Sequence, residues 1–306
     1  MAGRQVEIKV SVEMGMGTEK PFFFGNEGTK LFGILHTPLG AERKARSQRP
    51  KGIVFCHPFA EEKTISHRVV TNFARLLCRQ GYYVLRFDYR GCGDSEGDFA
   101  QATLTTRISD ISKAIDVLLE HTGTSILSLF GLRLGGTLAA LVAAADSRVN
   151  SLILWEPIVQ VRAYFKQFLR MQVIAENRRR NRVLGTLKSL VQELQEGRCV
   201  DIVGYCLSPK CFEEFTRVNV LARIGRFRGP TLIVSIGRQN RDRKDLQALL
   251  HAYLKTNTDV ELIRVQERLF WIDPNDPFRE LASWHGHDSL FEKTTDWLNT
   301  VWNGIA

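Results

Sequence analysis

Short apolar runs rich in β-branched residues recur along the chain, at residues 52–56, 82–86, 125–130, 149–154 and 231–236. Continuous runs of this length are typical of strands that are buried on both faces of a parallel sheet. Apolar residues between the first two runs repeat on one helical face from Ile65 to Leu77, and a second such stripe follows from Leu104 to Leu119. Strands that alternate with single helices predict right-handed crossovers and a mostly parallel sheet with helices on both faces.

The alternation of strands and helices follows an antiparallel pair near the start of the chain and is interrupted once by a helical stretch. Residues 21–25 and 29–36 predict an antiparallel pair that leads into the sheet, and residues 41–51 predict an exposed basic loop. From 159 to about 226 the strand rhythm stops, and a basic, helix-favouring stretch appears. Strands near 231–236 and 260–265 and helices near 244–254 and 290–301 then resume the pattern. The sequence therefore predicts an α/β core at 1–158 and 227–306 and a helical lid insertion at 159–226.

Composition narrows the class of protein. The 306 residues are 44% hydrophobic and 25% charged, which is typical of soluble globular proteins and excludes a disordered chain. The formal net charge of +9 favours anionic partners. The six cysteines form no CxxC pair, so we expect reduced thiols and neither a metal site nor a redox motif. No cofactor is expected.

Targeting and partner signals are few. The N-terminal residues contain no apolar run of the length that a secretory signal needs, which predicts a cytoplasmic location. The most apolar window, residues 125–145, carries Arg133 and three glycines near its middle, so a membrane span is not expected. The basic run at 178–180 lacks any accompanying nucleic-acid motif, so no nucleic-acid partner is expected.

A strand, a sharp turn and a helix are predicted around Gly131-Leu-Arg133-Leu-Gly135. This is the G-x-S-x-G spacing of a nucleophile elbow, with arginine at the serine position. The sequence Cys56-His57-Pro-Phe59 follows one strand as an oxyanion loop does, and DYRGCGDS at 88–95 follows the next. Together these segments resemble an α/β-hydrolase over nearly the whole chain.

The resemblance is closer still to the bacterial exosortase A system-associated hydrolases, type two. It rests on five segments: HPFAEE at 57–62, GCGDS at 91–95 with GDF at 97–99, GLR at 131–133, LWEP at 154–157 with QFLR at 167–170, and GYCLSP at 204–209. This family lies beside exopolysaccharide and protein-sorting genes, and the resemblance implies a hydrolase. We expect the protein to act on or bind an acylated or anionic small molecule. It does not imply a particular substrate.

Arginine at position 133 changes the expected chemistry. A guanidinium is protonated at any accessible pH and has no lone pair for attack on a carbonyl, so the acyl-enzyme route through this position is closed. The Leu134 N–H and the start of the following helix favour negative charge, so Arg133 and Leu134 are candidates for anion binding. The alternatives are a salt bridge from Arg133 to Glu61, Glu62 or Asp94, or a motif that is placed elsewhere.

The other members of a triad remain open. Candidates are Asp242 as the acid and either His285 or His287 as the base, with a surface histidine pair at the start of the last helix as the alternative. His57 and Phe59 are expected to shape the oxyanion loop, with the Phe59 and Leu134 N–H groups facing an oxyanion. Cys92 and Ser95 lie at the same sheet edge, where we expect Ser95 to hold a tight turn rather than to act as a nucleophile.

These features predict one α/β-hydrolase-fold domain, with a small-molecule or anionic ligand beneath the insertion. The rival interpretation is a catalytically inactive binding or scaffold protein that keeps the fold and has lost the serine. The sequence leaves open both the oligomeric state and whether the protein turns over a substrate.

Overall fold

A computed structural model of the chain describes residues 17–41, 49–180, 185–238, 243–256, 259–272 and 287–305. Its central feature is an eight-stranded sheet with the strand order β1-β2-β4-β3-β5-β6-β9-β10. The strands are β1 (Thr18–Asn26), β2 (Thr29–Thr37), β3 (Lys51–Cys56), β4 (Tyr83–Phe87), β5 (Ile126–Leu132), β6 (Val149–Trp155), β9 (Thr231–Ile236) and β10 (Val260–Val265). The pairs β1–β2 and β2–β4 are antiparallel, and the remaining pairs are parallel. The predicted fold class and the predicted antiparallel pair are therefore confirmed.

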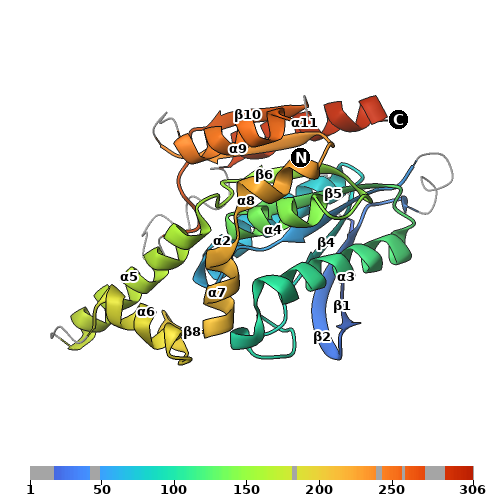
Figure 1. Ribbon diagram of the computed structural model, residues 1–306. Helices are drawn as coiled ribbons and strands as arrows, with labels where there is room; N and C mark the ends of the chain where they lie inside the picture. Colours follow the sequence, from blue (N-terminus) through green and yellow to red (C-terminus); the bar gives the residue numbers. More distant parts are fainter. Residues whose placement is uncertain are drawn as a thin grey trace, which may run out of the picture.

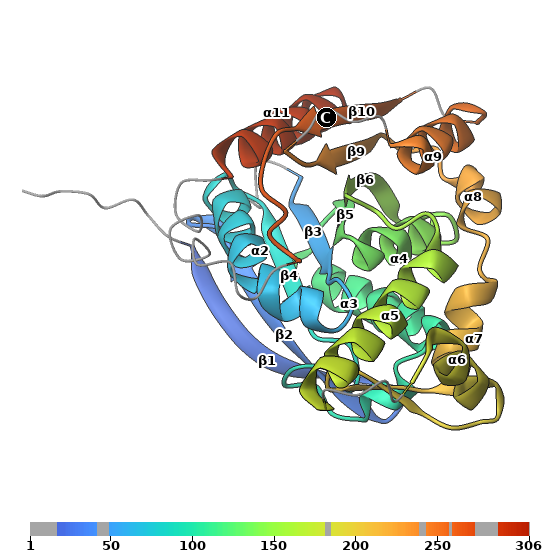
Figure 2. The ribbon, with the colours of Figure 1, turned by 90° about the vertical axis from the view of Figure 1, so that its left-hand side faces the viewer.

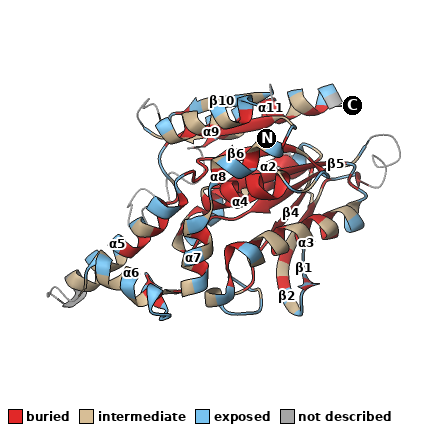
Figure 3. Ribbon diagram, in the orientation of Figure 1, coloured by how far each residue is buried: buried red, intermediate tan, exposed pale blue. Residues whose placement is uncertain are grey.

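Helices cover both faces of the sheet (Figures 1 and 2). One face packs against α2 (Glu61–Arg79) and α11 (Asp288–Ile305), and the other packs against α3 (Leu104–Thr122), α4 (Leu134–Ala143) and α9 (Lys244–Leu254). Successive residues of one strand serve opposite faces: Val54 packs with the α3 and α4 side, and Phe55 packs with the α2 side. Burial on both faces explains why the central strands appear in the sequence as continuous apolar runs (Figure 3).

Between β6 and β9 the chain forms a mostly helical segment, and we refer to residues 159–226 of it as the insertion. It contains α5 (Val161–Arg180), α6 (Leu187–Gln195), the antiparallel hairpin of β7 (Val200–Ile202) and β8 (Tyr205–Leu207), α7 (Pro209–Arg217) and α8 (Val220–Arg223). A short 3-10 turn at Ile224–Arg226 ends the insertion. A second 3-10 turn, at Phe99–Gln101, precedes α3 in the core. The helices α5 and α6 project away from the sheet (Figure 1). The hairpin is not predicted by the sequence pattern, because each of its strands has three residues and shows no clear periodicity.

Candidate functional site

Arg133 occupies the sharp turn between β5 and α4. Its backbone has φ 56° and ψ −123°, a left-handed conformation that a non-glycine residue adopts only at a cost. The glycines on either side make the turn possible. A Cβ on Gly131 would lie 2.4 Å from the Gly135 carbonyl oxygen, and a Cβ on Gly135 would lie 2.1 Å from the Cys56 carbonyl oxygen. The strand, turn and helix of a nucleophile elbow are therefore present, with an arginine side chain at their tip.

The Arg133 guanidinium pairs with Glu62 from the first turn of α2. Its Nε and Nη2 both donate to Glu62 Oε1, at 3.2 and 3.0 Å, and the Tyr164 hydroxyl of α5 donates to Glu62 Oε2 at 2.7 Å. The guanidinium carbon also lies 5.5 Å from the ring centre of Tyr164 and 5.3 Å from that of Trp271. Both charged side chains are about nine-tenths buried. A salt bridge from Arg133 to Glu62 is one of the alternatives that the sequence left open, and the structure contains it.

Burial dominates the protonation of this cluster. It raises the pKa of Glu62 above its usual range, against the opposing effect of the Arg133 charge and the hydrogen bonds from Tyr164 and Arg133. Burial, followed by the neighbouring Glu62 carboxylate, raises the pKa of Tyr164 well above 10. The Tyr164 hydroxyl therefore keeps its proton at neutral pH and remains a donor to Glu62.

The loop after β3 lies directly against this turn. A Cβ on Gly135 would clash with the carbonyl oxygens of both Cys56 and His57, so no side chain fits between the two segments. His57 is buried, and burial holds its pKa well below 6.5, so it is neutral at pH 7. Phe59 is also buried, and its ring packs against four others, those of Phe99, Phe165, Phe168 and Phe215. The backbone of Cys56 and His57 thus lies against the turn at Gly135, and the oxyanion-loop role expected of His57 and Phe59 stays a prediction.

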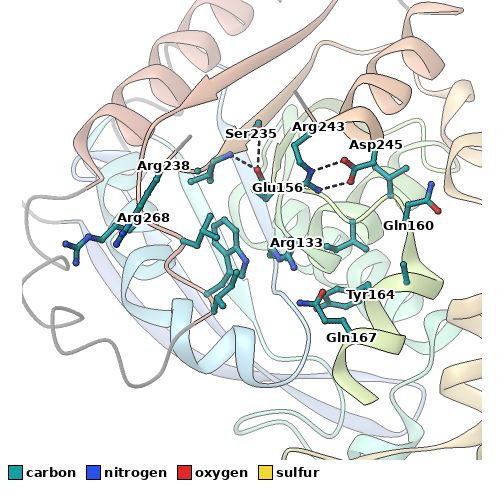
Figure 4. A pocket seen from close by; sticks show the side chains of 18 of the residues that line it. Arg133, Glu156, Gln160, Tyr164, Gln167, Ser235, Arg238, Arg243, Asp245 and Arg268 are labelled. Carbon is teal, nitrogen blue, oxygen red and sulfur yellow. Dashed lines mark hydrogen bonds and ion pairs between the residues drawn. The ribbon is translucent and has the colours of Figure 1, made fainter. Parts of the chain in front are cut away.

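A cavity of about 870 Å³ opens at the carboxyl ends of the strands, and Arg133 forms part of its wall. Figure 4 shows Arg133 between a group from β6, β9 and α9 on one side and the Tyr164 and Gln167 side chains of α5 on the other. The lining includes five arginines: Arg133, Arg170, Arg238, Arg243 and Arg268. Apolar side chains complete the wall, namely Ile158, Val159, Ala163, Ile236, Leu269, Trp271 and Ile272.

Two carboxylates of this wall are tied to Arg243. Its Nη1 donates to Glu156 at 2.7 Å, and its Nε and Nη2 bind both oxygens of Asp245, at 2.9 and 2.7 Å. Glu156 follows β6 at φ 46°, is 1% exposed, and also accepts the Ser235 hydroxyl and the Ile236 N–H. Sequence reasoning missed the roles of Glu156 and Arg243. The available signal was the Trp155-Glu156-Pro157 segment, which places a carboxylate directly after a buried strand.

Of the two histidine candidates, the structure describes His287, which lines a cleft other than the cavity beside Arg133. His287 Nδ1 is 2.5 Å from Glu267 Oε2, and Glu267 Oε1 accepts the Leu290 N–H at the start of α11. The His287 ring packs edge-on against Phe270 and lines a second cleft, between α2 and α11. Among the described residues, the cavity beside Arg133 has no histidine in its lining. Asp242 and His285 lie outside the described residues.

Ser95 and Cys92 occupy the loop after β4. The Ser95 hydroxyl donates to the Asp88 carbonyl oxygen at 2.6 Å and accepts the Phe32 N–H at 2.8 Å, so it joins this loop to β2. Cys92 Sγ lies 3.9 Å from Nη2 of the buried Arg107. Neither residue lines the cavity beside Arg133.

Two absences apply to the described part of the chain. Within those ranges, no three His, Cys, Asp or Glu side chains are grouped so that they could hold a metal ion. None of the helices described there is both long enough and apolar enough to span a membrane.

The sheet order, the elbow after β5 and the cavity at the strand ends together define an α/β-hydrolase fold. The chain belongs to the family described as Hydrolase_4, serine aminopeptidase S33, whose sequence model matches residues 48–235.

Curated relatives cover only part of the chain. The lysophosphatidylserine lipase ABHD12 of Danio rerio is 28% identical over 173 residues, which are 51% of this chain and 44% of that protein. The lysophosphatidylserine lipase ABHD12 of Xenopus tropicalis is 32% identical over the same shares. The matched segment is thus less than half the length of these relatives.

Solved structures match over nearly the whole chain at low identity. The esterase Pf2001 of Pyrococcus furiosus has a TM-score of 0.63 at 17% identity and covers 98% of this chain and 97% of its own. Est1E of Butyrivibrio proteoclasticus, solved with ferulic acid bound, has a TM-score of 0.61 at 18% identity and covers 91% of this chain and 99% of its own. These similarities establish the fold alone.

Proposed function

We propose that this α/β-hydrolase-family protein is of the exosortase-associated type and binds an acylated or anionic small molecule in the cavity beside Arg133. The observation that carries the proposal is the charge of the wall, where five arginines face two carboxylates. Arg133 is paired with Glu62, and Arg243 is paired with Glu156 and Asp245, while Arg170 and Arg238 add further positive charge to the wall. A partly enclosed positive surface of this kind attracts and orients anions.

The apolar part of the wall supports an acyl-bearing ligand. Ile158, Val159 and Trp271 are buried, and Leu269 and Ile272 are exposed beside them. A ligand with one charged end and one apolar end would satisfy both parts of such a wall. The relatives named as lysophosphatidylserine lipases are named for a ligand of this class, and Est1E holds a carboxylic acid.

Arg133 would contact the charged end of the ligand. A guanidinium has five N–H groups, and in the described structure two of its nitrogens donate to Glu62. The pairing with Glu62 fixes the side chain, so that its remaining N–H groups would meet a ligand with little loss of conformational freedom. Leu134 at the start of α4, with His57 and Phe59 behind the turn, would border the same end of the ligand.

The insertion would act as the lid of this site. The Tyr164 hydroxyl ties α5 to Glu62, and Ala163, Gln167 and Arg170 of the same helix line the cavity. The protein would work in the cytoplasm, since all six cysteines are free thiols.

The rival candidate is a binding or scaffold protein without turnover. It is favoured by one observation, that Arg133 is already neutralised by Glu62. Under this alternative Arg133 occupies the former nucleophile position and does not strengthen the binding of anions.

Calorimetry with octyl phosphate and octanoate, and with octyl glucoside as the uncharged control, tests the proposal. We expect both anions to bind and the glucoside to bind much more weakly. Arg133→Ala and Arg170→Ala should each weaken anion binding about tenfold or more, whereas Arg223→Ala, an exposed arginine outside the cavity, should not. Equal affinity for the three probes, or equal effects of the three variants, would contradict the proposal.

A further inference from the structure

The positive charge of the protein is concentrated in the insertion. Residues 159–226 contain 13 lysines and arginines and six aspartates and glutamates, a net charge of +7 out of +9 for the whole chain. Four of the basic residues, at 178–180 and 182, follow one another at the end of α5 and just after it. The described basic residues of the insertion are mostly exposed, among them Arg162, Arg170, Lys188 and Lys210.

Exposed apolar side chains lie on the same part of the molecule. Met171 and Ile174 of α5 are 40% and 51% exposed, and Val203 in the turn between β7 and β8 is 45% exposed. Met171 and Ile174 lie on one face of α5, because residues three apart are neighbours on a helix, whereas Val203 contacts α5 through its N–H bond to the Gln172 side chain. We call Met171 and Ile174 the apolar tip.

The apolar tip continues the cavity wall outward. Ala163, Gln167 and Arg170 line the cavity at helical spacing, and Met171 and Ile174 follow at i+4 from Gln167 and Arg170. The face of α5 that borders the cavity thus extends past it along a helix that projects from the core (Figures 1 and 2). A molecule that lay against the apolar tip would be next to the cavity mouth.

This combination selects among possible partners. Nucleic acid would satisfy the arginines and lysines but would leave the exposed Met171 and Ile174 without an apolar partner. A second copy of the chain would bring a second net charge of +7 against the first, which is repulsive. An anionic bilayer offers both headgroup charge and an apolar interior, and stable attachment of peripheral proteins requires two such signals together.

We propose that the insertion docks on a bilayer surface rich in anionic lipid, with the apolar tip entering the interface and the exposed Arg162 and Arg170 of α5 contacting the headgroups. The cavity would then face the surface from which an acyl-bearing ligand could enter. This docking does not depend on the proposed ligand site, because the apolar tip contains no residue of the cavity wall.

Sedimentation with vesicles tests the docking. The full chain should bind vesicles of phosphatidylglycerol and phosphatidylcholine at least about tenfold more strongly than vesicles of phosphatidylcholine alone, and the binding should weaken as salt is raised. The double variant Met171→Asp/Ile174→Asp should lose about tenfold in binding to the mixed vesicles. The matched control is Leu39→Asp/Leu254→Asp, which changes two residues of similar exposure, 52% and 43%, outside the insertion.

Circular dichroism melts should show that both double variants fold. Equal binding to the two vesicle types, or equal loss in the two double variants, would overturn the proposal. Light scattering distinguishes the other partner: a dimer that Met171→Asp/Ile174→Asp dissociates, without vesicle binding, would assign the apolar tip to a second copy. Octyl phosphate calorimetry on the same variants should remain unchanged, so failure of docking and failure of the ligand site can be told apart.

Discussion

Arg133 and Glu62 meet through a single carboxylate oxygen, Oε1, which accepts both the Nε and the Nη2 hydrogen bonds of the guanidinium. The second oxygen is left to the Tyr164 hydroxyl. The charge at the tip of the elbow is therefore held in place by the first turn of α2 and, through Glu62, by the insertion. This arrangement fixes a cation at the sharp turn between β5 and α4.

Substitutions of Arg133 and Glu62 should have strongly coupled effects on the free energy of unfolding. Arg133→Met leaves the Glu62 carboxyl without its cation, and we expect a loss of about 3 kcal/mol in the free energy of unfolding. The loss should grow as the pH rises, because the pKa of Glu62 is raised by burial and the lone carboxyl must then ionise in the folded state. Urea unfolding of both single variants and of the double variant with Glu62→Leu measures the coupling.

The double variant should lose less than the sum of the two single variants. The exposed pair of Arg217 and Glu213 on α7 is the control, and Arg217→Met should cost less than about 1 kcal/mol. Additive effects at Arg133 and Glu62 would show that the contact carries no energy of its own.

Restoring a serine at the elbow should not restore esterase chemistry. His287, the described histidine candidate, lines the cleft between α2 and α11 and pairs with Glu267 there, so no described histidine lines the cavity beside position 133. We expect Arg133→Ser to remain unlabelled by a fluorophosphonate probe and inactive on p-nitrophenyl esters. Labelling of Arg133→Ser but not of Arg133→Ala would show instead that a base reaches the elbow.

Acid should destabilise the protein through His36. Its Nε2 accepts a hydrogen bond from Arg86 at 2.9 Å, which requires an unprotonated nitrogen. Burial, followed by the Arg86 charge, lowers the pKa of His36 from 6.5 to about 4. The unfolded chain therefore binds this proton first, and the stability from a neutral His36 is present above pH 6.5 and is lost as the pH falls toward 4.

The expected loss across that window is roughly 2–3 kcal/mol, and His36→Gln should reduce it. Thermal unfolding followed at several pH values checks this, with the exposed His251→Gln as the control. An unchanged pH profile in His36→Gln would refute the assignment.

The elbow should not tolerate a side chain at Gly135. A Cβ there would lie 2.1 Å from the Cys56 carbonyl oxygen, and backbone on both sides prevents easy relief. We expect Gly135→Ala to lose roughly 3 kcal/mol in unfolding free energy. Gly304→Ala in α11, where a Cβ meets no atom within 4 Å, should be neutral or stabilising in the same urea titration.

Much of the core could be predicted from the sequence because its signals are local. Periodicity of burial distinguishes the continuous apolar runs of β3, β5 and β6 from the helical stripes of α2 and α3, and alternation of the two leads to a mostly parallel sheet. The elbow was recognisable for the same reason, since Gly131, Arg133 and Gly135 are neighbours in the chain and only glycine avoids the clashes that the turn creates.

The sequence by itself determined the order of the strands and helices of the α/β core, the turn at Arg133 and the positive charge of that position. Only the tertiary structure decided that Glu62, 71 residues away, is the partner of Arg133, that Glu156 and Arg243 join the cavity wall, and that His287 faces a different cleft. The physical reason is the separation along the chain over which each kind of signal acts. Periodicity and turn chemistry depend on residues a few positions apart, whereas the choice of a charged partner depends on which elements the sheet brings together and how their side chains are buried.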